Sequence, residues 1–458
     1  MAEILTEKSN LAAVGIARIF QGGQLVFDAD SVQRHTVAMK VRGAGDDFVK
    51  LFCYVVNWQE VLVDGEPITI APVNRPYYCF GDHELHDVRL TFTTYPSPMM
   101  SGLFWGCTAL EEVVFPDTLG GHDMQASVMN GCSNLRRVKL PEGIAGIGRQ
   151  MFMNCTSLES IDIPASVRTI GEQAFIGCTA LKNISLGPVV TTIGDQAFRG
   201  CAALAHIVMP HYLQEIGASA FRDCAGLKIA HLNGLLKKVG GYAFSGAGLE
   251  TMSMPDSVDE LGGHLFDRCT SLRTVTWLTA AAIPTFCFDH CNLLNQVWIN
   301  DDTAEIGDNA MACCYSLQTI KLPQGLRRLG AGCFGQCANL LAISIPDGVE
   351  VIDNATFYGC LMLGRIAVPQ SLRRIEMNAF YGASTLADTN YDYVHRVTGS
   401  ADPNDTTTER MVLLDLRGTA IEYIHVQAVL RSNIAVVVDT DARIAGGCTT
   451  LLRRSADE

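Results

Sequence analysis

Hydrophobic positions recur along the middle of the chain with a spacing that changes within each repeat. Between residues 101 and 386, an aromatic residue is followed three positions later by cysteine and three positions after that by leucine. The next segment alternates apolar and polar residues, as in "LESIDIP" from Leu158 and "LQTIKLP" from Leu317. Alternation with a period of two predicts a short strand with one buried face, and the proline that often follows predicts where that strand ends.

Each predicted strand is followed by a turn and by a second motif, I-G-x-x-A-F, as in "IGEQAF" from Ile170. Glycine after isoleucine permits a tight bend of the backbone. We expect alanine, phenylalanine and the next cysteine to form one short helical turn that packs inward. After a longer first step, this anchor position, which holds phenylalanine or methionine, returns at a nearly constant interval of roughly 23 residues. The thirteen anchors are Phe104, Met129, Phe152, Phe175, Phe198, Phe221, Phe244, Phe266, Phe288, Met311, Phe334, Phe357 and Phe380.

The repeat accounts for most of the cysteines. Of the 17 cysteines, eleven stand three positions after an anchor, and only Ala247 and Ala383 interrupt that column. A unit of this length is too small to bury its own apolar face, whereas stacked units share one continuous core. The spacing therefore predicts a solenoid with internal columns of phenylalanine, cysteine and leucine.

The full pattern, I-G-x-x-A-F-x-x-C-x-x-L-x-x-I-x-L-P, resembles the BspA-like, or Treponema pallidum type, leucine-rich repeats over residues 101–386. The resemblance implies an α/β solenoid. This is a right-handed leucine-rich-repeat superhelix of about 13 repeats, with a parallel β-sheet on the concave face and short helical turns opposite. It also implies a role in adhesion or recognition, because relatives in this family are often cell-surface or secreted proteins that bind host molecules.

The flanking segments do not repeat, and they predict separate parts of the molecule. Residues 1–100 contain strand-like runs such as "VLVDGEPITI", in which Asp64-Gly65 is a hairpin signal. We expect a small β-rich domain there that caps the first repeat and serves as a docking domain, since a bare solenoid end is open to aggregation. Residues 387–410 predict a polar surface loop, residues 411–440 a degenerate final repeat that acts as a C-terminal cap, and residues 441–458 a tail.

Composition and charge narrow the class of partner. Hydrophobic residues make up 48% of the chain and charged residues 18%, which is typical of a folded, core-rich protein. The net charge of −14 disfavours nucleic acid and anionic membrane surfaces as partners. No apolar run reaches the roughly 18 residues that membrane insertion requires, and the N-terminus lacks a signal-peptide pattern. We expect a protein that is cytoplasmic or assembled into a particle rather than classically secreted.

The outward positions of the predicted strands form the candidate binding surface. Most of these positions are small and polar, but His206, Val208, Ile229 and His231 are predicted to form one cluster across adjacent units, and Trp298 is predicted to be a lone exposed aromatic residue. Aromatic and apolar groups on a rigid surface are typical binding anchors. The alternative is that these side chains cover one another or pack against a loop.

Thiols and a histidine gather between residues 287 and 337, which raises the alternatives of a zinc site and of disulfides. The column cysteines should face the core, however, and the C-x-x-x-C spacings are not the usual C-x-x-C knuckle. We therefore expect free thiols that pack as small hydrophobic groups, with no metal and no cofactor. The residues concerned are Cys287, His290, Cys291, Cys313, Cys314, Cys333 and Cys337.

No motif indicates an enzyme. The chain lacks G-x-S-x-G, H-E-x-x-H, a phosphate-binding G-x-x-x-x-G-K and a dinucleotide-binding G-x-G-x-x-G. The alternative candidate is "GDHELHD", with Asp82, His83, His86 and Asp87, which we expect to be a solvated polar turn. We expect a non-enzymatic scaffold that binds a protein, with a glycan as the alternative ligand. A second hypothesis is a structural component of a larger assembly, such as a phage tail, docked through residues 1–100.

Overall fold

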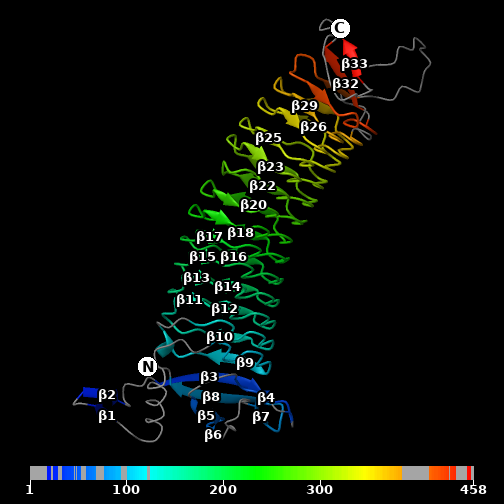
Figure 1. Cartoon of the computed structure of the whole chain (residues 1–458). Helices are drawn as coiled ribbons and strands as arrows, with labels where there is room; N and C mark the ends of the chain where they lie inside the picture. The colour runs from blue at the N-terminus through cyan, green and yellow to red at the C-terminus, as the bar shows by residue number, and fades with distance from the viewer. Residues whose placement is uncertain are drawn as a thin grey trace. The chain divides into compact units, whose positions relative to one another are not determined.

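The computed structural model describes residues 18–21, 24–28, 34–45, 47, 49–52, 58–68, 77–93, 101–120, 124–383, 412–432, 434–439 and 451–454. Two compact units make up the chain: residues 1–216 with 224–226, and residues 217–223 with 227–458. Both units contain coils stacked one on another (Figure 1). The predicted loop at residues 387–410 lies outside the described residues.

The first unit begins with antiparallel strands. The hairpin of β1 (Arg18–Gln21) and β2 (Gln24–Asp28) stands apart from a six-stranded sheet with the order β10-β9-β3-β8-β5-β6. The non-repeating strands of this sheet are β3 (Arg34–Arg42), β5 (Trp58–Val63), β6 (Glu66–Pro67) and β8 (Leu85–Thr93). A second pair joins β4 (Val49–Lys50) to β7 (Tyr77–Tyr78).

The predicted hairpin at Asp64-Gly65 is confirmed. Strands β5 and β6 pair antiparallel on either side of these two residues, whose φ angles are 52° and 89°. A two-residue turn with positive φ at both positions matches the right-handed twist of its strands, and this geometry favours Asp-Gly.

The N-terminal sheet continues directly into the repeats. Strand β9 (Leu110–Val114) pairs antiparallel with β3 on one side and parallel with β10 (Arg137–Lys139) on the other. The outer edge of the first repeat strand is therefore hydrogen-bonded instead of bare, which is what a cap has to provide. One 3₁₀ helix, η2 (Asp117–Leu119), follows β9.

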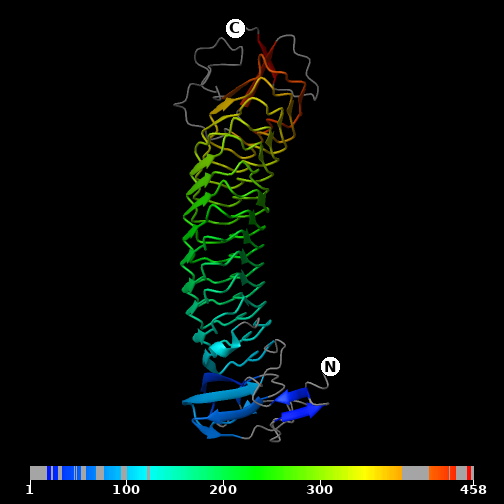
Figure 2. The same cartoon turned by 90° about the vertical axis from the view of Figure 1, so that its left-hand side faces the viewer.

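Two rows of parallel strands run along the coils, and Figure 2 shows them as two separate columns of arrows. The first row comes from the L-x-x-I-x-L segments, so the predicted parallel sheet is confirmed. In the first unit this row contains β9, β10, β12 (Ser160–Asp162), β14 (Asn183–Ser185) and β16 (His206–Val208). In the second unit it contains β18 (Ile229–His231), β20 (Thr251–Met254), β22 (Thr274–Trp277), β23 (Gln296–Ile299), β26 (Ala342–Ser344) and β28 (Arg365–Ala367).

The second row is built from the residues around the I-G motif, where we expected only a bend. In the first unit it contains β11 (Gly146–Ile147), β13 (Thr169–Ile170), β15 (Thr192–Ile193) and β17 (Glu215–Ile216). In the second unit it contains β19 (Lys238–Val239), β21 (Glu260–Leu261), β24 (Glu305–Ile306), β25 (Arg328–Leu329), β27 (Val351–Ile352), β29 (Arg374–Ile375) and β31 (Tyr423–Ile424).

The glycine after isoleucine serves close packing between coils. A Cβ atom at Gly171 would lie 2.7 Å from the Ile147 carbonyl oxygen, and one at Gly194 would lie 2.8 Å from the Glu172 nitrogen. Neither glycine has a positive φ. In these two coils the neighbouring backbone passes too near for a side chain, which explains the glycine. Other coils hold Pro284, Asp353 or Glu376 at this position.

The predicted short helical turns are not present among the described residues. The segments around the anchors are chains of hydrogen-bonded turns in which donors alternate: Ala174 N–H bonds to Gly171 O within its coil, whereas Phe175 N–H bonds to Ala197 O of the next coil. In all thirteen coils the residues two positions before and two positions after the anchor have positive φ. Two left-handed residues within five interrupt a right-handed helix, so the fold is a β-solenoid instead of an α/β one. The right-handed superhelix and its concave face stay predictions.

The anchors form buried stacks. The rings of Phe152 and Phe175 stand 5.0 Å apart at 8°, and those of Phe175 and Phe198 stand 5.2 Å apart at 3°. Phe244, Phe266 and Phe288 stack in the same way in the second unit. Each buried phenylalanine contributes about 1.5–3 kcal/mol of hydrophobic free energy, which so short a coil needs because it has no core of its own.

The cysteine column has a hydrogen-bonding role that packing alone does not explain. Each described thiol from Cys132 onward in this column donates to the carbonyl oxygen of the anchor in the preceding coil, at S···O distances between 3.0 Å (Cys132 to Phe104) and 3.3 Å (Cys314 to Phe288). The described cysteines are free thiols. Burial raises the pKa of Cys178 to about 12, so the column remains protonated and unreactive.

The C-terminal part of the second unit continues the parallel pairing. Strand β31 pairs with β29, and the backbone N–H of His425 bonds to Ile375 O at 2.9 Å. Strands β30 (Val412–Asp415), β32 (Ile434–Asp439) and β33 (Leu451–Arg454) form a separate parallel sheet. The C-terminal cap at residues 411–440 stays a prediction that these pairings favour, and the tail lies outside the described residues except for β33.

Candidate binding surface

The candidate surface is the outward face of the first strand row, where side chains alternate with those of the core. Its main column holds the middle residue of each I-x-L segment, and every member is exposed except Thr276, which is half-buried. The column consists of Val114, Lys139, Asp162, Ser185 and Val208 in the first unit, and His231, Ser253, Thr276, Trp298, Lys321, Ser344 and Ala367 in the second.

Three of the five sequence-predicted site residues are exposed apolar groups. Val208 is 78% exposed and Trp298 is 56% exposed, and Ile229 is also exposed. His206 lies beside Val208 on the outward side of β16 in the first unit, and His231 lies beside Ile229 on the outward side of β18 in the second. Each strand therefore presents one imidazole and one aliphatic side chain to solvent. The single cluster of four residues stays a prediction.

The column residues on the two strands that precede Trp298 are small and polar. Trp298 pairs in register with Thr276 of β22, which in turn pairs with Ser253 of β20. The neighbouring tryptophan, Trp277, has the opposite environment: it is 1% exposed, its indole N–H donates to Ala281 O at 3.1 Å, and its ring meets Phe288 edge-on. The period-two alternation of the strands thus separates a core tryptophan from a surface tryptophan.

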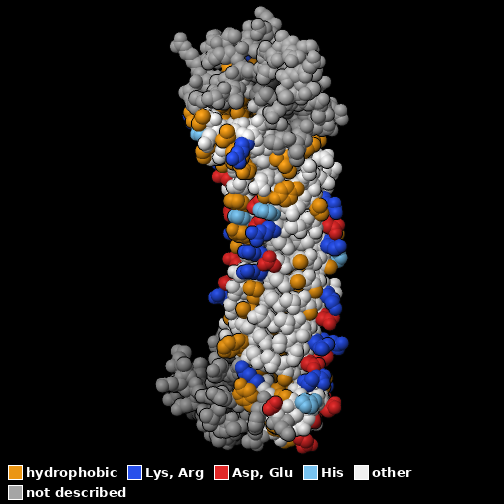
Figure 3. Space-filling view, turned by 90° about the vertical axis from the view of Figure 1, so that its right-hand side faces the viewer, with side chains coloured by type: hydrophobic (Ala, Val, Ile, Leu, Met, Phe, Trp, Pro, Cys, Tyr) orange, Lys and Arg blue, Asp and Glu red, His pale blue; other side chains and the backbone are white. Residues whose placement is uncertain are grey.

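Ion pairs between successive coils occupy much of the charged surface. Arg137 pairs with Glu112, Lys182 with Glu159, and Arg328 with both Glu305 and Asp308. Figure 3 shows charged side chains of both signs gathered in columns along the face that it presents. Exposed pairs of this kind contribute little to stability, but each neutralises its basic group locally.

Two of the candidate enzymatic residues, Asp82 and His86, form a hydrogen-bonded group with Asp64, which we call the clasp. His86 lies between Asp64 and Asp82, with Nδ1 and Nε2 each 2.8 Å from a carboxylate oxygen, and its ring stacks on Phe80. Burial lowers the pKa of His86, but its hydrogen bonds to Asp64 and Asp82 outweigh burial and raise it overall. Both ring nitrogens of His86 therefore have a carboxylate oxygen as their hydrogen-bond partner.

The other two residues of "GDHELHD" take no part in that clasp. Asp87 forms an ion pair with Lys40 at 2.6 Å, and the carbonyl oxygen of His83 accepts a hydrogen bond from Arg42. Sequence reasoning missed Asp64, which comes from the β5–β6 hairpin 22 residues before His86. The antiparallel pairing of β5 with β8 brings Asp64 to the histidine, and no local motif contains that information.

The seven residues of the zinc alternative separate into two groups. Cys287, Cys333 and the three column cysteines of this segment are fully buried, whereas His290 is exposed at the coil edge. Burial raises the pKa of Cys287 and of Cys333 well above its usual range. Cys313 belongs to neither group, because it lies at the edge beside His290 with only a small exposed area.

Sequence reasoning also missed the positions two residues before and after each anchor. Their positive φ is visible in the sequence as a preference for glycine, asparagine and aspartate in part of the column after the anchor. The signal is incomplete, because Arg268, His290, Cys313 and Gln336 occupy that same column in four consecutive coils.

Comparisons with known proteins agree with this architecture. A model of the BspA type leucine-rich repeat region, built from six copies, matches residues 97–228, 191–281 and 274–387, which together span residues 97–387 of the 458. No curated protein matches the chain. Among the described residues, no helix has the length and hydropathy that a membrane crossing requires.

Several solved structures are similar to parts of this chain. A leucine-rich repeat protein from Bacteroides ovatus is 21% identical, with a TM-score of 0.46, over 73% of this chain and 98% of that one. A leucine-rich cell surface protein from Faecalibacterium prausnitzii is 27% identical, with a TM-score of 0.40, over 58% of this chain and 81% of that one. The leucine-rich repeat protein of Treponema pallidum is 25% identical, with a TM-score of 0.29, over 45% of this chain and 83% of that one.

The family model covers well over half of the chain, and its repeats coincide with the stacked coils, the two rows of parallel strands and the buried anchor, cysteine and leucine columns. The chain therefore belongs to the BspA type of leucine-rich repeat proteins.

Proposed function

We propose that this protein is a non-enzymatic recognition scaffold that binds another protein through the outward face of its first strand row. The observation that carries the proposal is Trp298, a tryptophan more than half exposed on a strand that is hydrogen-bonded to its neighbour. A large aromatic side chain exposed to water on a fixed backbone is typical of an interface anchor. Binding removes its apolar surface from water, and little conformational entropy is lost because the backbone is already ordered.

The surroundings of Trp298 favour a protein partner over a glycan. Sugars are usually held by several aromatic faces together with polar side chains, whereas the column residues on either side of Trp298 are Thr276 and Lys321, which add no aromatic face. The exposed aliphatic side chains of Val208 and Ile229 are typical of protein interfaces as well. The name of the similar cell surface protein from F. prausnitzii is compatible with an adhesion role for this chain.

The test compares partner capture by the purified full chain and by matched tryptophan variants. Trp298→Ala removes the proposed anchor, and Trp105→Ala removes another tryptophan of almost the same exposure, 54%, from the first coil. We expect capture of a specific protein to fall at least tenfold with Trp298→Ala and to remain with Trp105→Ala, because an anchor contributes about 2 kcal/mol or more. Unchanged capture by the Trp298 variant contradicts the proposal.

A second function, docking into a larger assembly through the N-terminal domain, is favoured by a different observation. Tyr77 and Leu85 of that domain and Trp105 of the first coil are exposed, although Lys50 lies over the Trp105 ring. On this hypothesis the sensitivity of the two tryptophan variants is reversed. Light scattering of the full chain gives a second readout, because self-association that Trp105→Ala abolishes supports docking, and a monomer argues against it.

A further inference from the structure

In one short segment of the second unit, the position two residues after the anchor lacks the glycine that its backbone conformation favours. The position two residues after the anchor has positive φ in every coil, and glycine occupies seven of the thirteen. Four consecutive coils place longer side chains there, at φ values of 57° or 58°: Arg268, His290, Cys313 and Gln336. A non-glycine residue in this conformation costs on the order of 1 kcal/mol, so these side chains are retained against a local preference.

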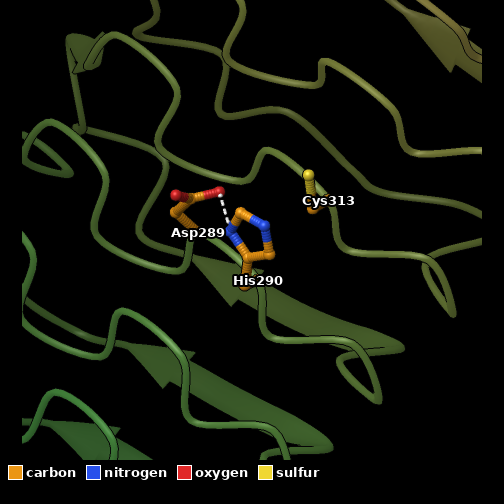
Figure 4. Close-up of side chains that lie close together, drawn as sticks. All are labelled: Asp289, His290 and Cys313. Carbon is orange, nitrogen blue, oxygen red and sulfur yellow. Dashed lines mark ion pairs between the residues drawn. The ribbon is translucent and has the colours of Figure 1, made fainter.

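Two members of this group and an adjacent carboxylate bring three metal-binding atoms together. Asp289 Oδ1 lies 2.9 Å from His290 Nδ1, and one donor atom from each of Asp289, His290 and Cys313 lies within 4.8 Å of the other two. Figure 4 shows the carboxylate and the thiol on opposite sides of the imidazole ring. The Asp289 side chain is 16% exposed and that of His290 is 48% exposed, so the group has a protected side and an open side.

Cys313 differs from the structural thiols beside it. The column cysteines donate to a backbone carbonyl oxygen, whereas Cys313 Sγ has the Gln336 side-chain oxygen as a partner at 3.7 Å. Cys313 therefore does not form the hydrogen bond to a backbone carbonyl oxygen that the column cysteines share.

A second carboxylate adds negative charge from the preceding coil. Asp267 is buried except for a small area, and its contacts with basic side chains are long ones, 3.8 Å to His264 and 3.9 Å to Arg268. Burial raises the pKa of Asp267, and Asp289 contributes to the increase although Arg268 opposes it. Two carboxylates from successive coils thus face the same region, which favours a cation there.

We propose that Asp289, His290 and Cys313 bind one divalent transition-metal ion of the zinc class, with a fourth coordination position open to solvent. Imidazole, thiolate and carboxylate are the ligands that zinc prefers, with bond lengths of about 2.0–2.3 Å and therefore ligand separations of roughly 3.5 Å. To hold the ion, the 2.9 Å separation of Asp289 Oδ1 and His290 Nδ1 has to widen, and any separation near the 4.8 Å limit has to narrow. Binding replaces the thiol proton of Cys313, which leaves to solvent as the metal–sulfur bond forms.

The ion would link two successive coils, because Cys313 follows the Met311 anchor and the other two ligands follow the Phe288 anchor. The backbones of these coils are already joined there by the bond from His290 N–H to Ala312 O at 3.0 Å. The open position faces away from the core, so a donor atom from a partner protein has access to it. This inference does not depend on the proposed function of the strand face.

The test is a titration of the full chain with cobalt(II) chloride in the presence of a phosphine reductant. We expect one equivalent to produce the near-ultraviolet thiolate-to-cobalt absorption band and the visible bands of four-coordinate cobalt, and we expect zinc chloride to displace it. The absence of a thiolate band overturns the proposal.

The column itself supplies variants that preserve the fold. Cys313→Gly and His290→Gly remove a ligand and introduce the residue most common in that column. We expect both variants to lose the near-ultraviolet thiolate-to-cobalt band. Cys313→Ser keeps the size of the side chain, and we expect it to lose this band alone. Asp289→Asn should weaken cobalt binding by about tenfold or more.

Arg268→Gly is the matched control, since it makes the same change one coil earlier without removing a ligand. We expect this variant to retain the band at unchanged stoichiometry. Persistence of the band in Cys313→Gly would overturn the assignment, because the absorption would then come from another thiol. Far-ultraviolet circular dichroism of each variant verifies that the coils are intact.

Discussion

Two regions of the molecule have the same backbone conformation but different surface side chains. One comprises the coils of the first unit between residues 146 and 201, and the other comprises the coils of the second unit between residues 240 and 317. Both contain buried anchors, column thiols bonded to carbonyl oxygens, and two left-handed residues in each coil. In the first region, the position two residues before the anchor holds glutamine repeatedly, and Gln150 donates to Gln173 at 2.6 Å. In the second, the same position holds the stacked rings of Tyr242, His264 and Phe286.

This difference shows which positions specify the fold and which are free to vary. The buried columns are nearly invariant along the chain because each coil must match the one before it in size and hydrogen bonding. The left-handed positions require only a backbone conformation, and their side chains are at least partly exposed except at Cys313. Chemistry can therefore change from coil to coil at these positions without altering the stack, and the metal-binding group that we propose lies at two of them.

The largest expected effect tests the claim that the buried columns are equivalent. Phe175→Ala removes a ring packed between Phe152 and Phe198, and Phe266→Ala does the same between Phe244 and Phe288. Each should lower the free energy of unfolding by about 3–5 kcal/mol through lost burial and a residual cavity. Urea denaturation measures both, and a cost in either region that is several-fold smaller would break the comparison.

The next effect concerns the left-handed positions. Gly200 has φ 75°, and a Cβ atom there would meet nothing closer than 3.9 Å, so Gly200→Ala isolates the conformational cost from steric clash. We expect a loss of about 1–2 kcal/mol in the free energy of unfolding. Cys313→Gly makes the opposite change and should leave the metal-free protein equally stable or more stable. Equal losses from both changes would contradict the assigned backbone conformation.

The stability of the N-terminal sheet should depend on pH through His86, Asp64 and Asp82. The pKa of His86 is raised, so its contribution is complete below the unfolded value of about 6.5 and is lost as pH rises through the folded value. Hydrogen bonds from His86 and from the Asp87 backbone lower the pKa of Asp64, and bonds from the Glu84 backbone and His86 lower that of Asp82. Their contributions are lost as pH falls below about 4.

The clasp should therefore stabilise the N-terminal sheet most between about pH 4 and pH 6.5. His86→Gln should lower the thermal midpoint at pH 5.5, and the difference from the unmodified protein should shrink by pH 8. Differential scanning calorimetry at the two pH values measures it. A difference that is the same at both would show that the histidine acts through packing on Phe80 instead of through charge.

The smallest stability effect is expected at the surface tryptophan. Trp298→Ala should change the free energy of unfolding by less than about 0.5 kcal/mol, because the ring is largely solvated. Trp277→Ala, in the preceding coil, should cost about 3–5 kcal/mol. The pair is a direct check on strand register, since a shift by one residue would exchange the two results.

By itself, the sequence determined the number and size of the coils, their shared core and the face that each strand residue occupies. A short repeat with fixed apolar positions has only one way to bury them all, so stacking follows from local spacing. The outward orientation of Trp298 and the Asp64-Gly65 hairpin follow from the same kind of local rule, a period of two and a two-residue turn.

Only the tertiary structure decided the features that depend on a neighbouring coil or strand. The I-G segment forms a second row of strands because the adjacent coil supplies the hydrogen-bond partner, and the anchors lie in turns instead of helices because alternate N–H groups are used between coils. The same reason applies to His86, which meets Asp64 through strand pairing, and to Cys313, which meets His290 through stacking. These contacts join residues that are far apart in the sequence, and the hydrophobic pattern carries no information about which polar side chains they bring together.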